Sequence, residues 1–339
     1  MKLLKAAVLG ASLFFVGASV SQASPTLDAV KKKGYVQCGF HVGLPGFSLA
    51  NSKGEWNGID VDLCKALATM VFNDPAKYKA TPLTTQQRFT ALQSGEVDVL
   101  TRNTTATLAR DTTLGLMSPG VNFYDSQGIM VKKDLGVKSA KELGGAAICV
   151  QPGTTTELNL ADWFRANGLE FKPVVINNPD EAMRSYEAGR CDAYTTDKSG
   201  LAVTRSTLAN PQDHVILPEA FSKEPLGPMV RQGDDQWFMM VRWALNLMLE
   251  AEEYGITSQN VDEMLKSPNP NIQRILGVTG EAGKGLGIDN KWGYNVIKHI
   301  GNYGESFNRH LGKDTPMGLE RGMNAQWRDG GLMYGWPVR

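Results

Sequence analysis

The chain has 339 residues, of which 42% are hydrophobic, enough to form one large domain or two of ordinary size. Lys and Arg together number 35, as do Asp and Glu together, and no long basic stretch is present. This balance excludes the positive surplus typical of proteins that bind nucleic acids or anionic membranes, so we expect no nucleic-acid partner.

The N-terminus predicts a secretory signal peptide over residues 1–23. Two lysines precede a mostly apolar run over residues 6–20, and Ser21-Gln22-Ala23 offers small residues at both positions that a signal peptidase reads. A retained membrane anchor is the alternative, but the run is shorter than the ~20 apolar residues that span a bilayer. Cleavage near Ala23 leaves 33 Lys and Arg against 35 Asp and Glu, a net charge of −2, in an exported protein.

Four cysteines are present, Cys38, Cys64, Cys149 and Cys191. Export to an oxidising compartment favours disulfides for an even number of cysteines. We predict the pairs Cys38–Cys64 and Cys149–Cys191, because each pair then stays within one candidate lobe. Four buried thiols are the alternative. No C-x-x-C spacing occurs, so the pattern matches no zinc site, and we expect no metal and no cofactor.

Helices and strands alternate along the first part of the exported chain. The expected elements are, in chain order, a helix over 26–33, a strand over 35–40, a loop with glycine and proline over 41–48, a helix from about residue 60 and a strand over 78–81. Alternation of this kind predicts a mostly parallel sheet with helices on both faces.

A candidate binding crevice follows the next strand. A capping box at Thr84 predicts a helix, and a short strand is expected over 97–99. Beyond the end of that strand lie the polar side chains of Asn103 and Thr105, followed by Arg110. Ligands bind at the carboxyl ends of strands in open α/β sheets, and a guanidinium holds a carboxylate through two parallel hydrogen bonds. A solvated arginine in a polar loop is the alternative interpretation of Arg110.

The middle of the chain repeats this organisation. An extended aromatic segment over 123–125 and a strand over 127–131 mark the first crossing between two lobes, and an apolar strand follows over 146–150. Thr154 with Glu157 then predicts a second capping box, whose helix start is a ready anion site. Ordinary capping with nothing bound is the alternative.

Two further strands complete the middle region. A strand over 173–176 precedes a helix that begins at Asn178, and a strand over 191–195 ends just before Asp197. Asp197 either caps the next helix or binds a cation. The return crossing is expected over 221–230. A strong helix over 238–253 follows, and we interpret the remaining glycine- and asparagine-rich segment as helices packed on the first lobe.

In this order, the motifs resemble the periplasmic solute-binding proteins of polar amino-acid ABC transporters (solute-binding protein family 3), most closely the broad-specificity, general L-amino-acid-binding type. The resemblance implies an α/β fold, a two-lobed clamshell of type II in which each lobe is a mostly parallel sheet flanked by helices. It places lobe 1 at 24–126 and 225–339, the latter with a C-terminal helical extension, and lobe 2 at 127–224. The motifs that carry it lie at residues 43–48, 58–64, 88–98, 102–105, 151–158, 189–197 and 330–334.

The resemblance also implies which residues bind the ligand. Arg110 and the loop with Thr154 and Thr155 would bind the α-carboxylate of an amino acid. Asp197 would bind the α-ammonium group, helped by the segment with Asn103 and Thr105. One cation, one helix N-terminus and one carboxylate match the two charges of a zwitterion.

The side chain of the ligand is expected to meet Arg88, which matches the position of a second arginine in binders of acidic amino acids. Arg88 would favour glutamate, aspartate, glutamine or asparagine, and Asn178 is a weaker candidate for the same pocket. A surface charge on a helix is the alternative for Arg88. Ala106 departs from the tryptophan common in similar sequences, which leaves the preferred ligand open.

The predicted function is therefore capture of L-amino acids and their delivery to an ABC permease in the inner membrane, by a periplasmic protein that we expect to be a monomer. The rival is an enzyme on the same fold, such as a dehydratase-like or lytic-transglycosylase-like relative. Such an enzyme needs a general acid or base in the cleft. None of the four histidines lies in a recognisable motif, so we expect a binding protein rather than an enzyme.

Overall fold

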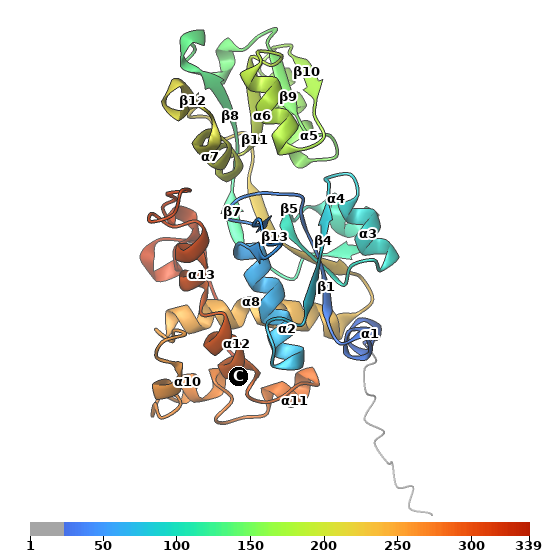
Figure 1. The fold of residues 1–339 in the computed structure, drawn as a ribbon, viewed down its shortest axis with the longest axis vertical. Helices are drawn as coiled ribbons and strands as arrows, with labels where there is room; N and C mark the ends of the chain where they lie inside the picture. Colours follow the sequence, from blue (N-terminus) through green and yellow to red (C-terminus); the bar gives the residue numbers. More distant parts are fainter. Residues whose placement is uncertain (1–23) are drawn as a thin grey trace, which may run out of the picture.

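Two β-sheets, each flanked by helices, divide the described part of the chain, residues 24–339, in the computed structural model (Figure 1). The predicted signal peptide over residues 1–23 lies outside the described residues. We call the first sheet with its helices lobe 1 and the second sheet with its helices lobe 2. The two-lobed α/β fold class expected from the sequence is confirmed.

The sheet of lobe 1 has the strand order β4-β1-β5-β13-β6, with β7 also paired to β13. Strand β1 is parallel to β4 and β5, whereas β13 is antiparallel to β5, β6 and β7. The sheet is therefore mixed rather than mostly parallel as expected, because the returning strand β13 enters it in the opposite direction. The strands are β1 (Val36–His41), β4 (Tyr78–Leu83), β5 (Val99–Thr105), β6 (Leu116–Met117), β7 (Phe123–Asp125) and β13 (Glu224–Arg231); a hairpin of β2 (Leu49–Ala50) and β3 (Trp56–Asn57) stands apart. The helices of this lobe that precede the C-terminal extension are α1 (Pro25–Lys33), α2 (Ile59–Phe72), α3 (Arg88–Ser94), α4 (Leu108–Thr113) and α8 (Asp235–Glu253).

The sheet of lobe 2 has the order β10-β9-β11-β8-β12. Its parallel part is β10-β9-β11, and β8 runs antiparallel to both β11 and β12. The elements are β8 (Gln127–Lys132), β9 (Ala147–Val150), α5 (Thr155–Ala166), β10 (Lys172–Val175), α6 (Pro179–Glu187), β11 (Ala193–Asp197), α7 (Lys198–Thr207) and β12 (His214–Ile216), with short 3₁₀ turns at Lys133–Leu135, Ala140–Glu142 and Pro211–Asp213.

The chain passes between the lobes twice, and the two passages lie side by side. Strand β7 belongs to the first sheet, β8 begins the second, and β13 returns to the first. The Gln127 backbone N–H donates to Ser222 Oγ at 3.2 Å, and the Phe221 N–H donates to the Gln127 carbonyl at 3.0 Å. The two connections therefore form one paired hinge region. The residue limits of the lobes proposed from the sequence stay a prediction.

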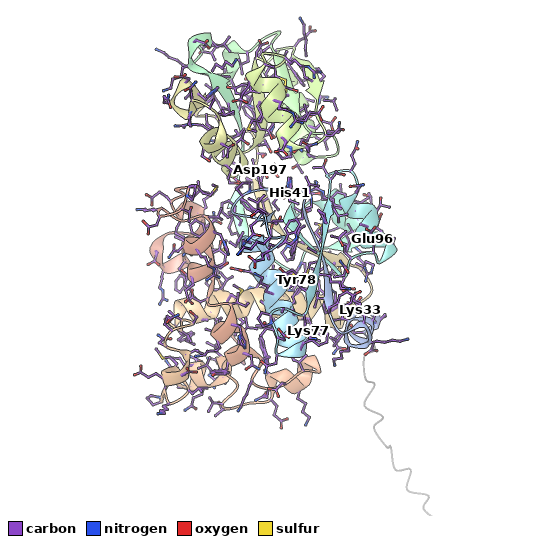
Figure 2. The ribbon with its side chains drawn as sticks, in the orientation of Figure 1. Lys33, His41, Lys77, Tyr78, Glu96 and Asp197 are labelled. Carbon is purple, nitrogen blue, oxygen red and sulfur yellow. A yellow bond between two sulfur atoms is a disulfide. The ribbon has the colours of Figure 1, made fainter. Side chains whose placement is uncertain are left out.

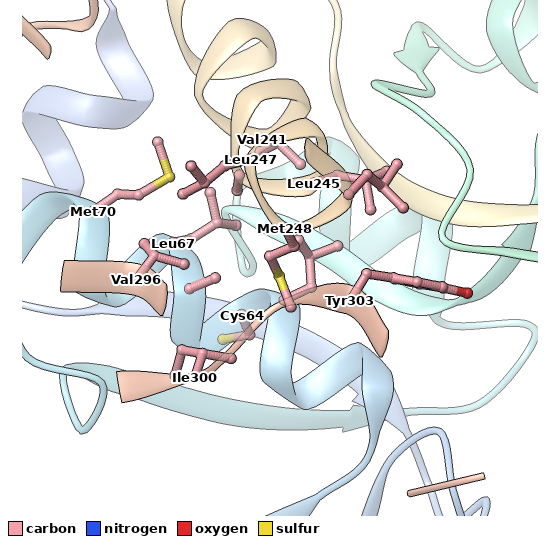
Figure 3. Close-up of a cluster of buried hydrophobic side chains, with 14 of the residues drawn as sticks. Cys64, Leu67, Met70, Val241, Leu245, Leu247, Met248, Val296, Ile300 and Tyr303 are labelled. Atoms are coloured by element: carbon pink, nitrogen blue, oxygen red, sulfur yellow. The ribbon is translucent and has the colours of Figure 1, made fainter. Parts of the chain in front are cut away.

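The C-terminal segment folds into helices that pack on lobe 1, as expected. Figure 3 shows apolar side chains of α2, α8 and this segment, among them Leu67, Val241 and Val296, packed into one buried cluster. Met317, from the loop beyond these helices, borders a cavity of about 280 Å³ beside α7 of lobe 2. The segment consists of α9 (Val261–Met264), α10 (Pro270–Ile275), α11 (Ala282–Leu286), α12 (Trp292–His299) and α13 (Tyr303–His310), with 3₁₀ turns at Gly322–Asn324 and Trp327–Asp329.

Three expected boundaries beside the site were wrong. Strand β11 includes Asp197 as its last residue, whereas the expected strand ended before it. Strand β5 extends to Thr105, because β13 pairs with it as far as Thr105 opposite Leu226, so Asn103 and Thr105 lie within the strand rather than beyond its end. Helix α3 begins at Arg88 rather than near Thr84. The reciprocal bonds of the capping box at Thr84 are nevertheless present, at 3.2 and 3.3 Å.

Both predicted disulfides are present. Cys38 of β1 is bonded to Cys64 of α2, which ties the first sheet to a helix on its face. Cys149 of β9 is bonded to Cys191 just before β11. Each bond joins elements of a single lobe, and no cysteine of the described chain is free.

Within residues 24–339, no helix combines the length and the apolarity needed to cross a bilayer.

Replacing both Cys149 and Cys191 by alanine should destabilise the protein by about 4 kcal/mol, the chain-entropy value for a bond of sequence separation 42. Urea unfolding followed by far-UV circular dichroism will show a lower midpoint than for the oxidised parent. Reduction of the parent should produce a shift in the same direction. An unchanged midpoint would mean that this disulfide contributes nothing to stability.

Candidate functional site

Polar side chains of both lobes meet at the junction of the two sheets. A cavity of about 30 Å³ lies there, lined from lobe 1 by His41 and Asn103 and from lobe 2 by Gln151, Tyr194 and Asp197. Figure 2 shows His41 and Asp197 close to each other where the two lobes face one another. The strands that carry His41, Asn103 and Asp197 all have their carboxyl-terminal halves at this junction, which is the binding edge of open α/β sheets.

Three buried arginines of lobe 1 surround this junction. Arg88, Arg102 and Arg110 are 3%, 1% and 7% exposed, so the interpretations of Arg88 as a surface charge and of Arg110 as a solvated loop residue are wrong. Arg110 Nη1 donates to the Thr105 carbonyl at 2.6 Å, and Arg102 Nε donates to the Leu83 carbonyl at 2.9 Å. Backbone carbonyls thus orient two of the guanidinium groups.

Arg88 also contacts lobe 2. Its Nη2 lies 3.5 Å from the Gly153 carbonyl, in the loop before α5, and its Nη1 lies 3.5 Å from Thr104 Oγ1. Burial, together with the charges of Arg102 and Arg110, holds the pKa of Arg88 well below its usual range. Burial also lowers the pKa of Arg102 to about 9. The three arginines therefore lie close enough together for the charges of two of them to lower the pKa of the third.

Carboxylates from both lobes oppose these cations. Burial and the neighbouring charges of Asp125 and Glu224 raise the pKa of Asp197 well above its usual range, against the opposing effect of Arg88 and Arg110. Burial raises the pKa of Asp125 to about 6. Asp197 occupies the N-cap position of α7 but makes no side-chain capping bond, so the capping role considered for it is wrong. The cations of the protein therefore do not fully compensate the negative charge of the ionised Asp197 carboxylate.

Glu224 connects the lobes directly. Its Oε2 accepts from Thr105 Oγ1 of lobe 1 at 2.5 Å and from Thr155 Oγ1 of lobe 2 at 3.0 Å. Its Oε1 accepts from Asn159 at 2.9 Å and from Ser222 at 2.5 Å. The residue is 1% exposed. Sequence reasoning missed it, because an acidic residue at the start of the returning strand does not by itself indicate contacts with both lobes.

Thr155 and Thr105 are brought together, with their hydroxyl oxygens 3.3 Å apart. Thr154 is differently engaged, because its hydroxyl accepts from the Glu157 N–H at 3.1 Å and donates to the Gln151 carbonyl at 2.7 Å. The Glu157 carboxylate accepts from the Gly153 N–H at 2.9 Å, one residue before the cap. The hydroxyl of Thr154 is thus committed to the helix start.

Asn103 and Asn178 have contrasting positions. Asn103 lines the cavity in a backbone conformation with φ of +28°, which non-glycine residues rarely adopt, and its N–H donates to Asp60 Oδ2 at 2.9 Å. Asn178 caps α6 by accepting from the Glu181 N–H at 2.9 Å, while the adjacent Pro179 lines the cavity. The side-chain oxygen of Asn178 is therefore already engaged.

His41 is a second residue that sequence reasoning missed. Burial and the charges of Arg102 and Arg88 hold the pKa of His41 well below its usual range, so the ring is neutral. Its Nδ1 lies 3.0 Å from the Gly43 N–H, which makes Nδ1 the acceptor and leaves the proton on Nε2. No group of three or more His, Cys, Asp or Glu suited to a metal ion occurs within residues 24–339.

Opposite charges from two lobes, buried at one junction and close enough to shift one another's pKa, suit a ligand that carries both charges. Residues 36–260 match the bacterial extracellular solute-binding proteins, family 3, and the chain belongs to this family. Its relatives are solute-binding components of transporters rather than enzymes.

Two similar proteins align over nearly their whole length. The chain is 57% identical over 340 residues to the general L-amino acid-binding periplasmic protein AapJ of Rhizobium johnstonii, covering 100% of this chain and 99% of that one. It is 52% identical over 336 residues to the glutamate/glutamine/aspartate/asparagine-binding protein BztA of Rhodobacter capsulatus, covering 99% of each.

A solved structure has the same fold throughout. The periplasmic binding protein of an ABC transporter from Brucella ovis, with glutathione bound, is similar with a TM-score of 0.91 and 57% sequence identity, covering 94% of this chain and 100% of that one.

Replacing Asp197 by asparagine should stabilise the ligand-free protein. The folded state raises the pKa of Asp197. The free energy of unfolding therefore falls as the pH rises from the pKa of an unfolded aspartate through the higher pKa in the folded protein. Asparagine removes that cost, so we expect the melting temperature at pH 8 to rise by about 2 °C. At pH 5 the difference should shrink. The control is Asp162→Asn on the exposed face of α5, and an Asp197→Asn variant that melts lower at pH 8 would contradict the prediction.

Proposed function

We propose that this protein captures L-amino acids between its two lobes in the periplasm and delivers them to an ABC permease. The observation that carries the proposal is the opposition of Arg110 in lobe 1 and Asp197 in lobe 2, two buried charges that influence each other's pKa across the junction. Membership of the solute-binding family and the printed specificities of the similar proteins support it.

The α-carboxylate of the ligand binds to Arg110 and to the start of α5. The first N–H groups of a helix have no partners within the helix and attract an anion. Because the hydroxyl of Thr154 caps α5, Thr154 and Thr155 contribute chiefly through their backbone N–H groups. The α-ammonium group binds to Asp197, with Asn103 and Thr105 supplying further oxygen acceptors.

Closure of the lobes follows from this division of charge. An open form satisfies one charged end of the ligand, whereas the closed form satisfies both, so the ligand shifts the population towards closure. The hinge is the paired segment around Gln127 and Phe221, and neither disulfide crosses it. A permease can then distinguish loaded from empty protein by shape.

The side chain of the ligand meets Arg88, which favours the acidic amino acids and their amides, as the name of the similar protein from Rhodobacter capsulatus suggests. Asn178 contributes at the edge of the same pocket, beside Pro179. Glutathione in the similar structure from Brucella ovis indicates that larger ligands with two carboxylates also fit this type of cleft.

Export and assembly complete the proposal. A signal peptide cleaved near Ala23 directs the protein to the periplasm, where both disulfides form. The protein acts as a monomer that docks on the permease in the inner membrane.

The decisive experiment is a thermal-shift screen of the twenty L-amino acids, with the D-isomers as controls. A ligand that binds only the folded state stabilises it by mass action, so binders raise the melting temperature. We expect the largest shifts for glutamate, glutamine, aspartate and asparagine. The absence of a shift with every L-amino acid would overturn the proposal, and recovery of a chemically altered ligand would favour an enzyme.

Replacing Arg88 by alanine should weaken binding of glutamate by about 10-fold or more, because one charge-assisted pair contributes roughly 1.5–3 kcal/mol, while alanine binding changes little. Titration calorimetry measures both affinities. Arg165→Ala, on the exposed face of α5, is the matched control. Equal losses for glutamate and alanine would show that Arg88 does not bind the ligand side chain.

Ligand binding should release protons. An ammonium group next to Asp197 favours the ionised carboxylate and lowers its raised pKa. The affinity should therefore increase as the pH rises through the pKa that Asp197 has in the ligand-free protein. Calorimetry in buffers of different ionisation enthalpy will show proton release at pH values around and below the raised pKa of Asp197. Uptake of protons, or a buffer-independent enthalpy between pH 5 and 8, would contradict this role of Asp197.

A further inference from the structure

Glu224 accepts four side-chain hydrogen bonds at the point where the lobes meet. The donors are Thr105 at 2.5 Å, Thr155 at 3.0 Å, Asn159 at 2.9 Å and Ser222 at 2.5 Å. An ionised carboxylate has no proton to give, so all four partners must donate to it. The donors come from lobe 1, from lobe 2 and from the return crossing.

This arrangement fixes the orientation of two hydroxyl groups. A threonine hydroxyl has a single proton, and Thr105 and Thr155 both direct theirs to the same oxygen, Oε2 of Glu224. The two hydroxyl oxygens lie 3.3 Å apart, and only their lone pairs remain available to a ligand. Each hydroxyl is therefore an acceptor rather than a donor towards any third group.

We propose that Glu224 is a positioning residue that makes Thr105 and Thr155 acceptors for the α-ammonium group of the ligand. The inference rests on the proposed function and deepens it. An approaching carboxylate meets lone pairs at these hydroxyls and is repelled, whereas an ammonium group finds two acceptors in addition to Asp197. The carboxylate is left to Arg110, which bonds the Thr105 carbonyl rather than its hydroxyl.

This assignment changes the role of Thr155. The resemblance to known binding proteins implied that Thr155 helps to bind the α-carboxylate. Its hydroxyl proton is used by Glu224, so only its backbone N–H, in the first turn of α5, remains for an anion. One residue thus offers a donor to one end of the zwitterion and an acceptor to the other.

A double-mutant cycle tests the proposal with Glu224→Gln, Thr105→Val and the combined variant. Glutamine keeps the shape of the side chain but adds an N–H donor, which lets a threonine turn its proton towards the ligand. If Glu224 acts through the hydroxyl, each single variant should weaken binding of L-glutamine by about 10-fold, and the combined variant should be no more than about 3-fold weaker than either.

Independent action of Glu224 and Thr105 gives a different result. Independent effects multiply, so the combined variant would then lose about 100-fold, and this outcome would overturn the proposal. An unchanged affinity in Glu224→Gln would overturn it as well. Should Glu224→Gln fail to fold, as judged by circular dichroism, Glu224→Asp replaces it in the same cycle.

The matched control is Glu219→Gln in lobe 2. Glu219 also accepts from a hydroxyl, Ser139 Oγ at 2.5 Å, but outside the junction. Its replacement should leave the affinity for L-glutamine unchanged, and a loss equal to that of Glu224→Gln would overturn the proposal. If the parent protein binds no amino acid in the initial screen, the proposed function itself has failed. If the parent binds and the cycle is additive, only the role of Glu224 has failed.

Discussion

Burial of opposite charges at one junction is the constraint on which the rest of this structure depends. Three arginines of lobe 1 and the carboxylates of Asp197 and Glu224 are removed from water where the two sheets meet. Charges in such surroundings need partners of opposite sign. Among the described residues, Arg88 Nε and Arg102 Nη2 are buried without a hydrogen-bond partner. Under the proposed function, a zwitterionic ligand would supply charges of both signs at this junction, which would link ligand occupancy to the relative position of the lobes.

Much of the architecture followed from local patterns in the sequence. The alternation of helices and strands predicted the α/β lobes, and the positions of Cys38, Cys64, Cys149 and Cys191 predicted two disulfides that each stay within one lobe. The length of β5 could not be obtained in this way, because its last residues are held by pairing with β13, a strand more than a hundred residues later. Long-range pairing overrides the local pattern there.

The site was predicted unevenly for a similar reason. Local signals placed Arg110 and Asp197 just beyond expected strands, but the gathering of both with Arg88 at one place was implied by the family resemblance. Glu224 acquires its role only through contacts with residues from both lobes, which no spacing in the sequence reveals. Thr154 shows the reverse case. The capping pattern drew attention to Thr154 as a ligand-binding residue, but its hydroxyl is already engaged in the capping bond from the Glu157 N–H.

The loop beyond α13 has a practical consequence for watching the protein move. Met317 is carried by lobe 1, yet it borders a cavity beside α7 of lobe 2, away from the charged junction. The surroundings of residue 317 change when the two lobes move relative to each other, and none of the residues assigned to the ligand lines this cavity. An environment-sensitive dye attached at residue 317 would change its fluorescence when the lobes close on a ligand. The labelled protein would then report the concentration of that solute.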